Sequence, residues 1–202
     1  MTARTDTRTR ILRKGAQLIH ARGYNATGLQ EILTGAGVPK GSFYFYFKSK
    51  EDFGLQLIDY YAAFIGGIFS RFLDDTSIGP VERIGRLFDF YEDFFTQKSC
   101  GLGCPIGNLS LELGDTSGRF RGRLSAAIES LIAKLESCLM DMKREGAIPS
   151  SVDTAEAARF IFHGFEGAIL HMKVTRNIGP IRSFRKCVLE YLHAPRVDAR
   201  NK

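Results

Sequence analysis

Apolar residues recur at steps of three and four positions along most of the chain, which is the period of an amphipathic helix. The pattern predicts a first helix that Gly23 ends, a short second helix over about 27–35 and a third over 39–47, which Pro39 begins. No stretch of useful length alternates as a half-buried strand would. The sequence therefore predicts an all-α chain.

The later part of the chain continues the same pattern in longer segments, separated by breaks rich in glycine and proline. Helices are expected over 49–73, 81–98, 117–145, 152–175 and 180–193, with a short apolar segment around 109–113. We expect a domain of three short helices in residues 1–50 and a larger helical domain in residues 51–202.

The break between the second and third helices is a tight turn, Ala36-Gly37-Val38. Gly37 can adopt the left-handed conformation that such a turn demands, and Val38 can fill the angle between the helices. Phe43 and Phe47 are four residues apart and would bury together on the inner face of the third helix. These features predict a helix-turn-helix, whose second helix lies in the major groove of DNA.

The distribution of charge points in the same direction. The 202 residues carry a net charge of +6, but residues 1–50 alone hold nine lysines and arginines against two acidic residues. The remainder, with 19 basic and 20 acidic residues, is close to neutral. A positive field confined to the first quarter of the chain suits binding to a polyanion.

Five consecutive aromatic residues, 43–47, occupy the third helix, and they cannot all face one core. The residues expected to point wholly or partly outward are Lys40, Gly41, Ser42, Tyr44, Phe45 and Tyr46. Their charge, hydroxyl groups and flat apolar surface suit phosphate oxygens, base edges and thymine methyl groups. Thr27, at the expected start of the second helix, would present its hydroxyl and nearby amides to a phosphate.

Residues 27–51 resemble the signature of TetR-family regulators, with Gly-Val, then Lys-Gly-x-aromatic-Tyr-x-Tyr-Phe, then Ser-Lys-Glu. The similarity extends over about residues 8–60. It implies a repressor that binds double-stranded operator DNA as a homodimer and needs no cofactor, with a helical effector-binding and dimerisation domain after the helix-turn-helix. The family's DNA-contacting positions fall on Thr27, Lys40, Gly41, Ser42, Tyr44, Tyr46 and Lys50. Phe45 departs from the histidine that is commoner at its position, so base preference there is open.

The two last predicted helices, near 152–175 and 180–193, combine large apolar residues with Gly164, Gly167 and Ala168. Small residues permit close helix approach, and a palindromic operator requires a two-fold dimer, so we expect these helices to form the dimer contact. Ordinary packing within one chain is the alternative.

The aromatic-rich middle could also enclose a small organic effector, with polar contacts from Tyr91, Asn108 or His163. Core packing is again the alternative.

The most distinctive segment outside the helix-turn-helix is Gly101-Leu-Gly-Cys104-Pro-Ile-Gly-Asn108. Cys104 precedes Pro105, where a helix can begin, and a helix N-terminus lowers the pKa of a thiol and favours the thiolate. The segment resembles one in a TetR-family branch of NemR-like and AcuR-like regulators, which respond to reactive electrophiles or small unsaturated acids. Cys104 is then either a sensor thiol, with Cys100 as a partner, or a small buried residue beneath a glycine-rich kink.

Other functional classes find little support in the sequence. It contains no phosphate-binding glycine loop after a strand, no His/Cys set with metal spacing and no nucleophile elbow, so we expect neither an enzyme nor a metal site. No segment has the roughly 20 apolar residues of a membrane span, and the polar N-terminus predicts a cytoplasmic protein. A non-specific architectural DNA-binding protein is the main alternative, although it would carry its positive charge over most of its surface.

Overall fold

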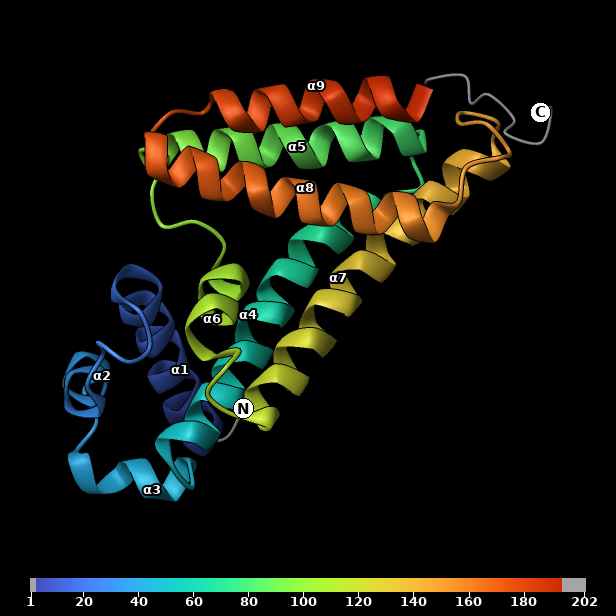
Figure 1. Cartoon of the computed structure of the whole chain (residues 1–202). Helices are drawn as coiled ribbons and strands as arrows, with labels where there is room; N and C mark the ends of the chain where they lie inside the picture. The colour runs from blue at the N-terminus through green and yellow to red at the C-terminus, as the bar shows by residue number, and fades with distance from the viewer. Residues whose placement is uncertain (1–2, 194–202) are drawn as a thin grey trace. The chain divides into compact units, whose positions relative to one another are not determined.

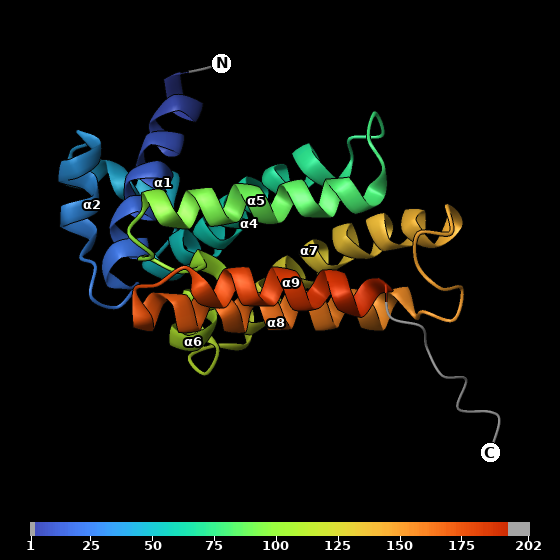
Figure 2. The same cartoon turned by 90° about the horizontal axis from the view of Figure 1, so that it is seen from above.

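The fold was analysed in a computed structural model, which describes residues 3–193. Over these residues the chain forms α-helices and one 3-10 turn, with no strand, which confirms the all-α prediction (Figures 1 and 2). The elements in order are α1 (Ala3–Arg22), α2 (Leu29–Ala36), the 3-10 turn (Lys40–Ser42), α3 (Phe43–Tyr46), α4 (Lys50–Leu73), α5 (Pro80–Gln97), α6 (Pro105–Leu113), α7 (Gly118–Arg144), α8 (Thr154–Thr175) and α9 (Gly179–His193). None of these helices is long and apolar enough to cross a membrane.

Two of the predicted short helices have different bounds in the structure. The third helix is split, because Pro39 is extended (φ −59°, ψ 144°) and a 3-10 turn precedes the single turn of α3. The second helix begins two residues later than expected, at Leu29, since Thr27 belongs to a turn in which its amide donates to the carbonyl of Tyr24. The breaks around α4, α5 and α7 to α9 lie within a few residues of their predicted places.

The chain packs as two compact units, and α4 and α7 each contribute to both. The first unit comprises Met1–Phe64 and Cys104–Ile128, and the second comprises Ile65–Gly103 and Glu129–Lys202. By packing, α6 and the start of α7 therefore accompany the three short N-terminal helices. The functional division at residue 50 stays a prediction.

An aromatic cluster forms the core of the first unit. The rings of Phe43, Phe47 and Phe53 are at most 1% exposed, and their centroids lie 5.1–6.1 Å apart. Helix α1 packs closely on this cluster, because a Cβ at Gly15 would overlap the ring of Phe53. The hydroxyl of Tyr61 on α4 donates to the carbonyl of Ala16 at 2.6 Å. Helices α1 and α3 are thus fixed against the first half of α4.

The second unit contains α5, α8 and α9, whose ribbons run side by side in Figures 1 and 2. Phe88 of α5, Phe165 of α8 and Phe184 of α9 bring their rings together, with centroids 5.4–5.8 Å apart. A Cβ at Gly164 would come within 2.6 Å of the Phe184 ring, so this glycine allows α8 and α9 of the same chain to approach. The guanidinium of Arg83, only 4% exposed, pairs with Asp141 at 2.8 Å.

Candidate nucleic-acid interface

The turn between α2 and α3 has the geometry that its sequence predicts. Gly37 adopts a left-handed conformation (φ 64°, ψ 40°), and its amide donates to the carbonyl of Thr34. The amide of Val38 donates to the carbonyl of Leu33 at 2.9 Å, and the side chain of Val38 is buried. These bonds satisfy carbonyl groups that would otherwise be unpaired at the end of α2. The chain therefore forms a helix-turn-helix.

The recognition segment, residues 40–46, has a buried side and an exposed side. Phe43 is 1% exposed, whereas Tyr44 and Phe45 are 71% and 61% exposed. Lys40 and Gly41 are exposed as well, and a Cβ at Gly41 would meet no atom within 4 Å. Ser42 and Tyr46 are half-buried. Two adjacent aromatic side chains exposed together form an apolar patch, and such a patch suits a binding surface.

Thr27 and Lys50, which the resemblance places among the DNA contacts, both form hydrogen bonds to the backbone between α1 and α2. Thr27 is fully buried and its hydroxyl donates to the carbonyl of Gly23 at 2.7 Å, so the expectation of an outward hydroxyl is wrong. The cause is the turn over residues 24–27, which directs the side chain inward. Lys50 is half-buried, and its ammonium group donates to the carbonyl of Thr27 at 3.1 Å and lies 4.8 Å from the centroid of the Tyr24 ring.

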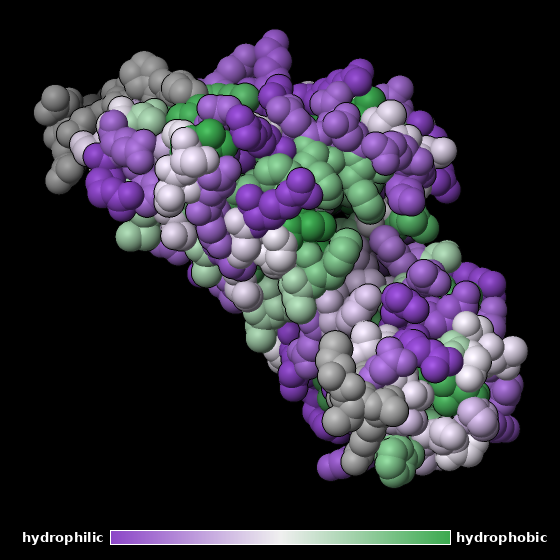
Figure 3. All heavy atoms as spheres, turned by 180° about the vertical axis from the view of Figure 1, so that it is seen from behind, coloured by the Kyte–Doolittle hydropathy of each residue, from purple (hydrophilic) through white to green (hydrophobic). Residues whose placement is uncertain are grey.

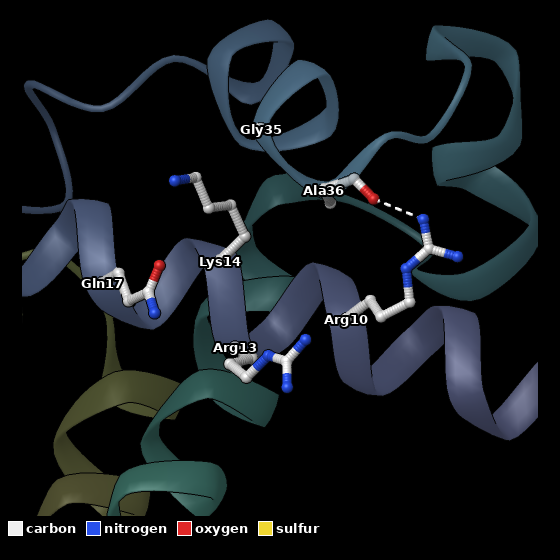
Figure 4. Close-up of a pocket in the computed structure, with 6 residues that line it drawn as sticks. All are labelled: Arg10, Arg13, Lys14, Gln17, Gly35 and Ala36. Atoms are coloured by element: carbon white, nitrogen blue, oxygen red, sulfur yellow. Dashed lines mark hydrogen bonds between the residues drawn. The ribbon is translucent and has the colours of Figure 1, made fainter.

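A basic surface pocket of about 310 Å³ lies between α1 and α2 (Figure 4). It is lined by Arg10, Arg13, Lys14, Gln17, Gly35 and Ala36. The guanidinium of Arg10 donates to the carbonyl of Ala36 at 2.6 Å, directly before the turn. A positive charge is favourable at this C-terminal end of a helix. Nothing near Arg10 in the sequence indicates that its side chain reaches a carbonyl 26 residues away.

Comparisons with known proteins agree with this geometry. Residues 11–57 match the family model described as bacterial regulatory proteins, tetR family, and residues 80–188 match the tetracyclin repressor-like C-terminal domain. The chain belongs to the TetR family. It is a DNA-binding transcriptional regulator, as the helix-turn-helix and the resemblance predict.

Individual TetR-family proteins resemble the chain over nearly its whole length. It is 35% identical to the HTH-type transcriptional repressor DhaR of Mycobacterium sp. (strain GP1), over 94% of each chain. It is 30% identical to the HTH-type transcriptional repressor NemR of Escherichia coli (strain K12), over 95% of this chain and 96% of that one. The crystal structure of the reduced form of E. coli NemR superposes with a TM-score of 0.83, at 28% identity, over 94% of this chain and 98% of that one.

The residues expected to form an effector site of this TetR-family regulator divide between the two units. Tyr91 lies in the core of the second unit, where its ring centroid is 5.2 Å from that of Phe165. His163 is exposed on α8, and its polar contact with an effector stays a prediction. Its neighbours Phe162 and Phe165 take the buried positions of that turn. Asn108 is half-buried on α6, in the first unit.

Cys104 is the N-cap residue of α6, as the following proline predicts. Its sulfur accepts a hydrogen bond from the amide of Gly107 at 3.5 Å, and the residue is half-buried. Cys100 and Cys138 are buried, whereas Cys187 is exposed, and none of the four cysteines forms a disulfide in the described part of the chain. Among the cysteines, Cys104 is thus the one that combines partial exposure with a helix N-terminus.

Proposed function

We propose that the chain is a dimeric transcriptional repressor that binds a two-fold symmetric operator and is released by a small organic or electrophilic effector. The observation that carries this proposal is the exposure of Tyr44 and Phe45 on a segment whose other aromatic residues are buried or half-buried. The names of DhaR and NemR, both called repressors, support the direction of regulation.

The DNA contacts divide into phosphate contacts and base contacts. Lys40 supplies a positive charge at the start of the segment, and the hydroxyl groups of Tyr44 and Tyr46 reach phosphate oxygens. Ser42 and Phe45 face base edges, where the Phe45 ring packs against thymine methyl groups. The absence of a side chain at Gly41 allows the backbone to approach the DNA.

Support of the backbone is the role we assign to Thr27 and Lys50. Both hold the turn from which α2 begins, through the carbonyls of Gly23 and Thr27. The phosphate contact expected near Thr27 then comes from the backbone amides at the start of α2. Gly28 is the N-cap of this helix and has no side chain to bond these amides, so they are available to a phosphate.

A second copy of the chain is the proposed partner of the exposed side of α8. Phe160, Leu170 and Val174 are 53%, 54% and 75% exposed, and with Gly167 they follow one another at helical spacing. A Cβ at Gly167 would meet no atom within 4 Å, so this glycine leaves room for an approaching helix. Other large apolar residues of the two helices expected to form the dimer contact are instead buried within the chain, including Ile161, Phe165 and Val188. Figure 3 shows the molecule from behind the view of Figure 1, in which α8 lies in front, so it draws a different face, which is largely hydrophilic with clusters of apolar side chains.

The effector, in this proposal, acts through Cys104. A thiolate at a helix N-terminus is a good nucleophile, and partial exposure gives reagents access to it. The Cys104→Ser variant should keep operator binding but resist release by thiol-reactive electrophiles, while Cys187→Ser should respond as the wild type does. If electrophiles release Cys104→Ser normally, Cys104 is a structural residue.

A gel-shift titration tests the repressor proposal against the architectural alternative. The probe is the DNA that flanks the gene for this chain, with unlabelled specific and scrambled DNA as competitors. We expect the specific competitor to displace the probe at much lower concentration, because base contacts distinguish the two sequences. Equal competition would support non-specific binding instead.

A further inference from the structure

The loop between α1 and α2, residues 23–28, is attached to a helix that lies far away in the sequence. The carboxylate of Glu112, near the end of α6, accepts a hydrogen bond from the amide of Tyr24 at 2.7 Å. Its other oxygen accepts from the amide of Asn25 at 2.6 Å. One carboxylate thus holds two consecutive backbone amides, and hydrogen bonds to an ionised acceptor are among the stronger ones in proteins.

Gly23 allows this carboxylate to approach the loop. Its φ of +93° lies in a region that residues with a side chain rarely adopt, and a Cβ there would lie 3.0 Å from Oε2 of Glu112. The same glycine accepts the hydroxyl bond of Thr27 through its carbonyl. The backbone of the loop therefore bonds to the carboxylate of Glu112 through its amides and to the hydroxyl of Thr27 through the carbonyl of Gly23.

The loop is also tied to α4 and leads directly into the helix-turn-helix. The hydroxyl of Tyr24 donates to the carbonyl of Lys50 at 2.7 Å, and the ammonium group of Lys50 donates to the carbonyl of Thr27. Helix α2 begins two residues after Thr27. The position of the loop therefore sets where α2, and with it the recognition segment, begins.

We propose that Glu112 is a positioning residue through which α6 holds the α1–α2 loop, and thereby the helix-turn-helix, in its DNA-binding position. The inference rests on the proposed function, because it concerns the same DNA-binding segment. Helix α6 begins after Cys104 and carries Glu112 about two turns later. A shift of α6 must either move the loop or break both amide bonds, so α6 connects the proposed sensor thiol with the DNA-binding helices.

The Glu112→Gln variant tests this role by the sign of its effect. Removing a negative charge by itself should strengthen binding to DNA, a polyanion. Loss of a charge-assisted bond to the loop should instead weaken operator binding, by about tenfold. Asp59→Asn is the matched control, because Asp59 lies in the same unit and pairs with Arg123 on the surface rather than with the loop. Its affinity should stay equal to that of the wild type or rise.

Hydrogen exchange supplies a second readout, and Gly23→Ala a second variant. In Glu112→Gln the amides of Tyr24 and Asn25 should exchange faster than in the wild type. Gly23→Ala should also weaken operator binding, because the added Cβ would push the carboxylate of Glu112 away from the loop. Unchanged operator affinity in a folded Glu112→Gln protein whose two amides exchange faster would overturn the inference. Failure of the wild type to prefer its operator would instead overturn the proposed function.

Discussion

The rings of Phe43 and Phe47, four residues apart, lie with their centroids 5.2 Å from each other and are both 1% exposed. This contact decides which aromatic residues of the recognition segment face outward. Phe43→Ala should therefore lower the free energy of unfolding by about 3–5 kcal/mol, as large core truncations do. Phe45→Ala, on the exposed side, should change it by less than about 0.5 kcal/mol. Urea denaturation of both variants measures the difference, and equal losses would contradict the assignment of the two sides.

Arg10 supports the turn of the helix-turn-helix through the carbonyl of Ala36. Arg10→Gln should lower the free energy of unfolding by about 1 kcal/mol, since the bond is only partly buried. Arg13→Gln is the control, because Arg13 lines the same pocket from the same helix and is exposed. Thermal denaturation should give a lower Tm for Arg10→Gln alone. A matching decrease in Arg13→Gln would attribute the effect to charge rather than to the turn.

The exposed apolar side of α8 makes a prediction about assembly. Leu170→Glu combined with Val174→Glu should convert the dimer to monomers, because charges at an apolar contact are desolvated without a partner. Met140→Glu is the control, with a side chain that is 55% exposed on α7 of the same unit. Sedimentation at micromolar concentration measures the mass. A wild type that sediments as a monomer, or a double variant that remains dimeric, would exclude this side as the contact.

The thiol of Cys138 predicts a loss of stability at alkaline pH. Burial raises the pKa of this thiol from about 9 to about 12, and the thiol donates to the carbonyl of Pro80. In the unfolded chain the thiol ionises near its ordinary pKa, while in the folded chain it stays protonated, so its contribution to stability falls as the pH rises from about 9 to about 12. Urea denaturation at pH 8 and pH 10.5 should show a smaller decrease for Cys138→Ala than for the wild type. An equal decrease would mean that Cys138 does not contribute.

Patterns local in the sequence predicted the long helices and the turn of the helix-turn-helix, but not the bounds of the second and third helices. Gly37 and Val38 have the conformation and burial that their side chains favour, and Pro105 marks the start of α6. The spacing of apolar residues was sufficient to predict the long helices, because each of these helices buries one stripe of side chains. The four-residue spacing of Phe43 and Phe47 also predicted which residues of the recognition segment are buried, because the segment is short and packs by one side only.

The errors and omissions arise from contacts that the helical pattern does not specify, some of them local and some between distant segments. Thr27 was expected at the surface, but its hydroxyl is taken up by Gly23 within a loop that Glu112 holds from 87 residues away. Nothing in the sequence near Thr27 indicates that Glu112 bonds to this loop. Gly164 was expected to permit contact between two chains, whereas it makes room for Phe184 of the same chain. Small residues indicate a close approach without specifying which helix approaches.

Operator affinity of Tyr44→Phe and Phe45→Ala, measured by fluorescence anisotropy beside the wild type, tests the central claim most directly. Tyr44 and Phe45 are the most exposed aromatic residues of the recognition segment. We expect each variant to keep the wild-type Tm and to bind the operator about tenfold more weakly, since each loses about one contact to DNA. Wild-type affinity in both folded variants would contradict the claim that this exposed side reads DNA.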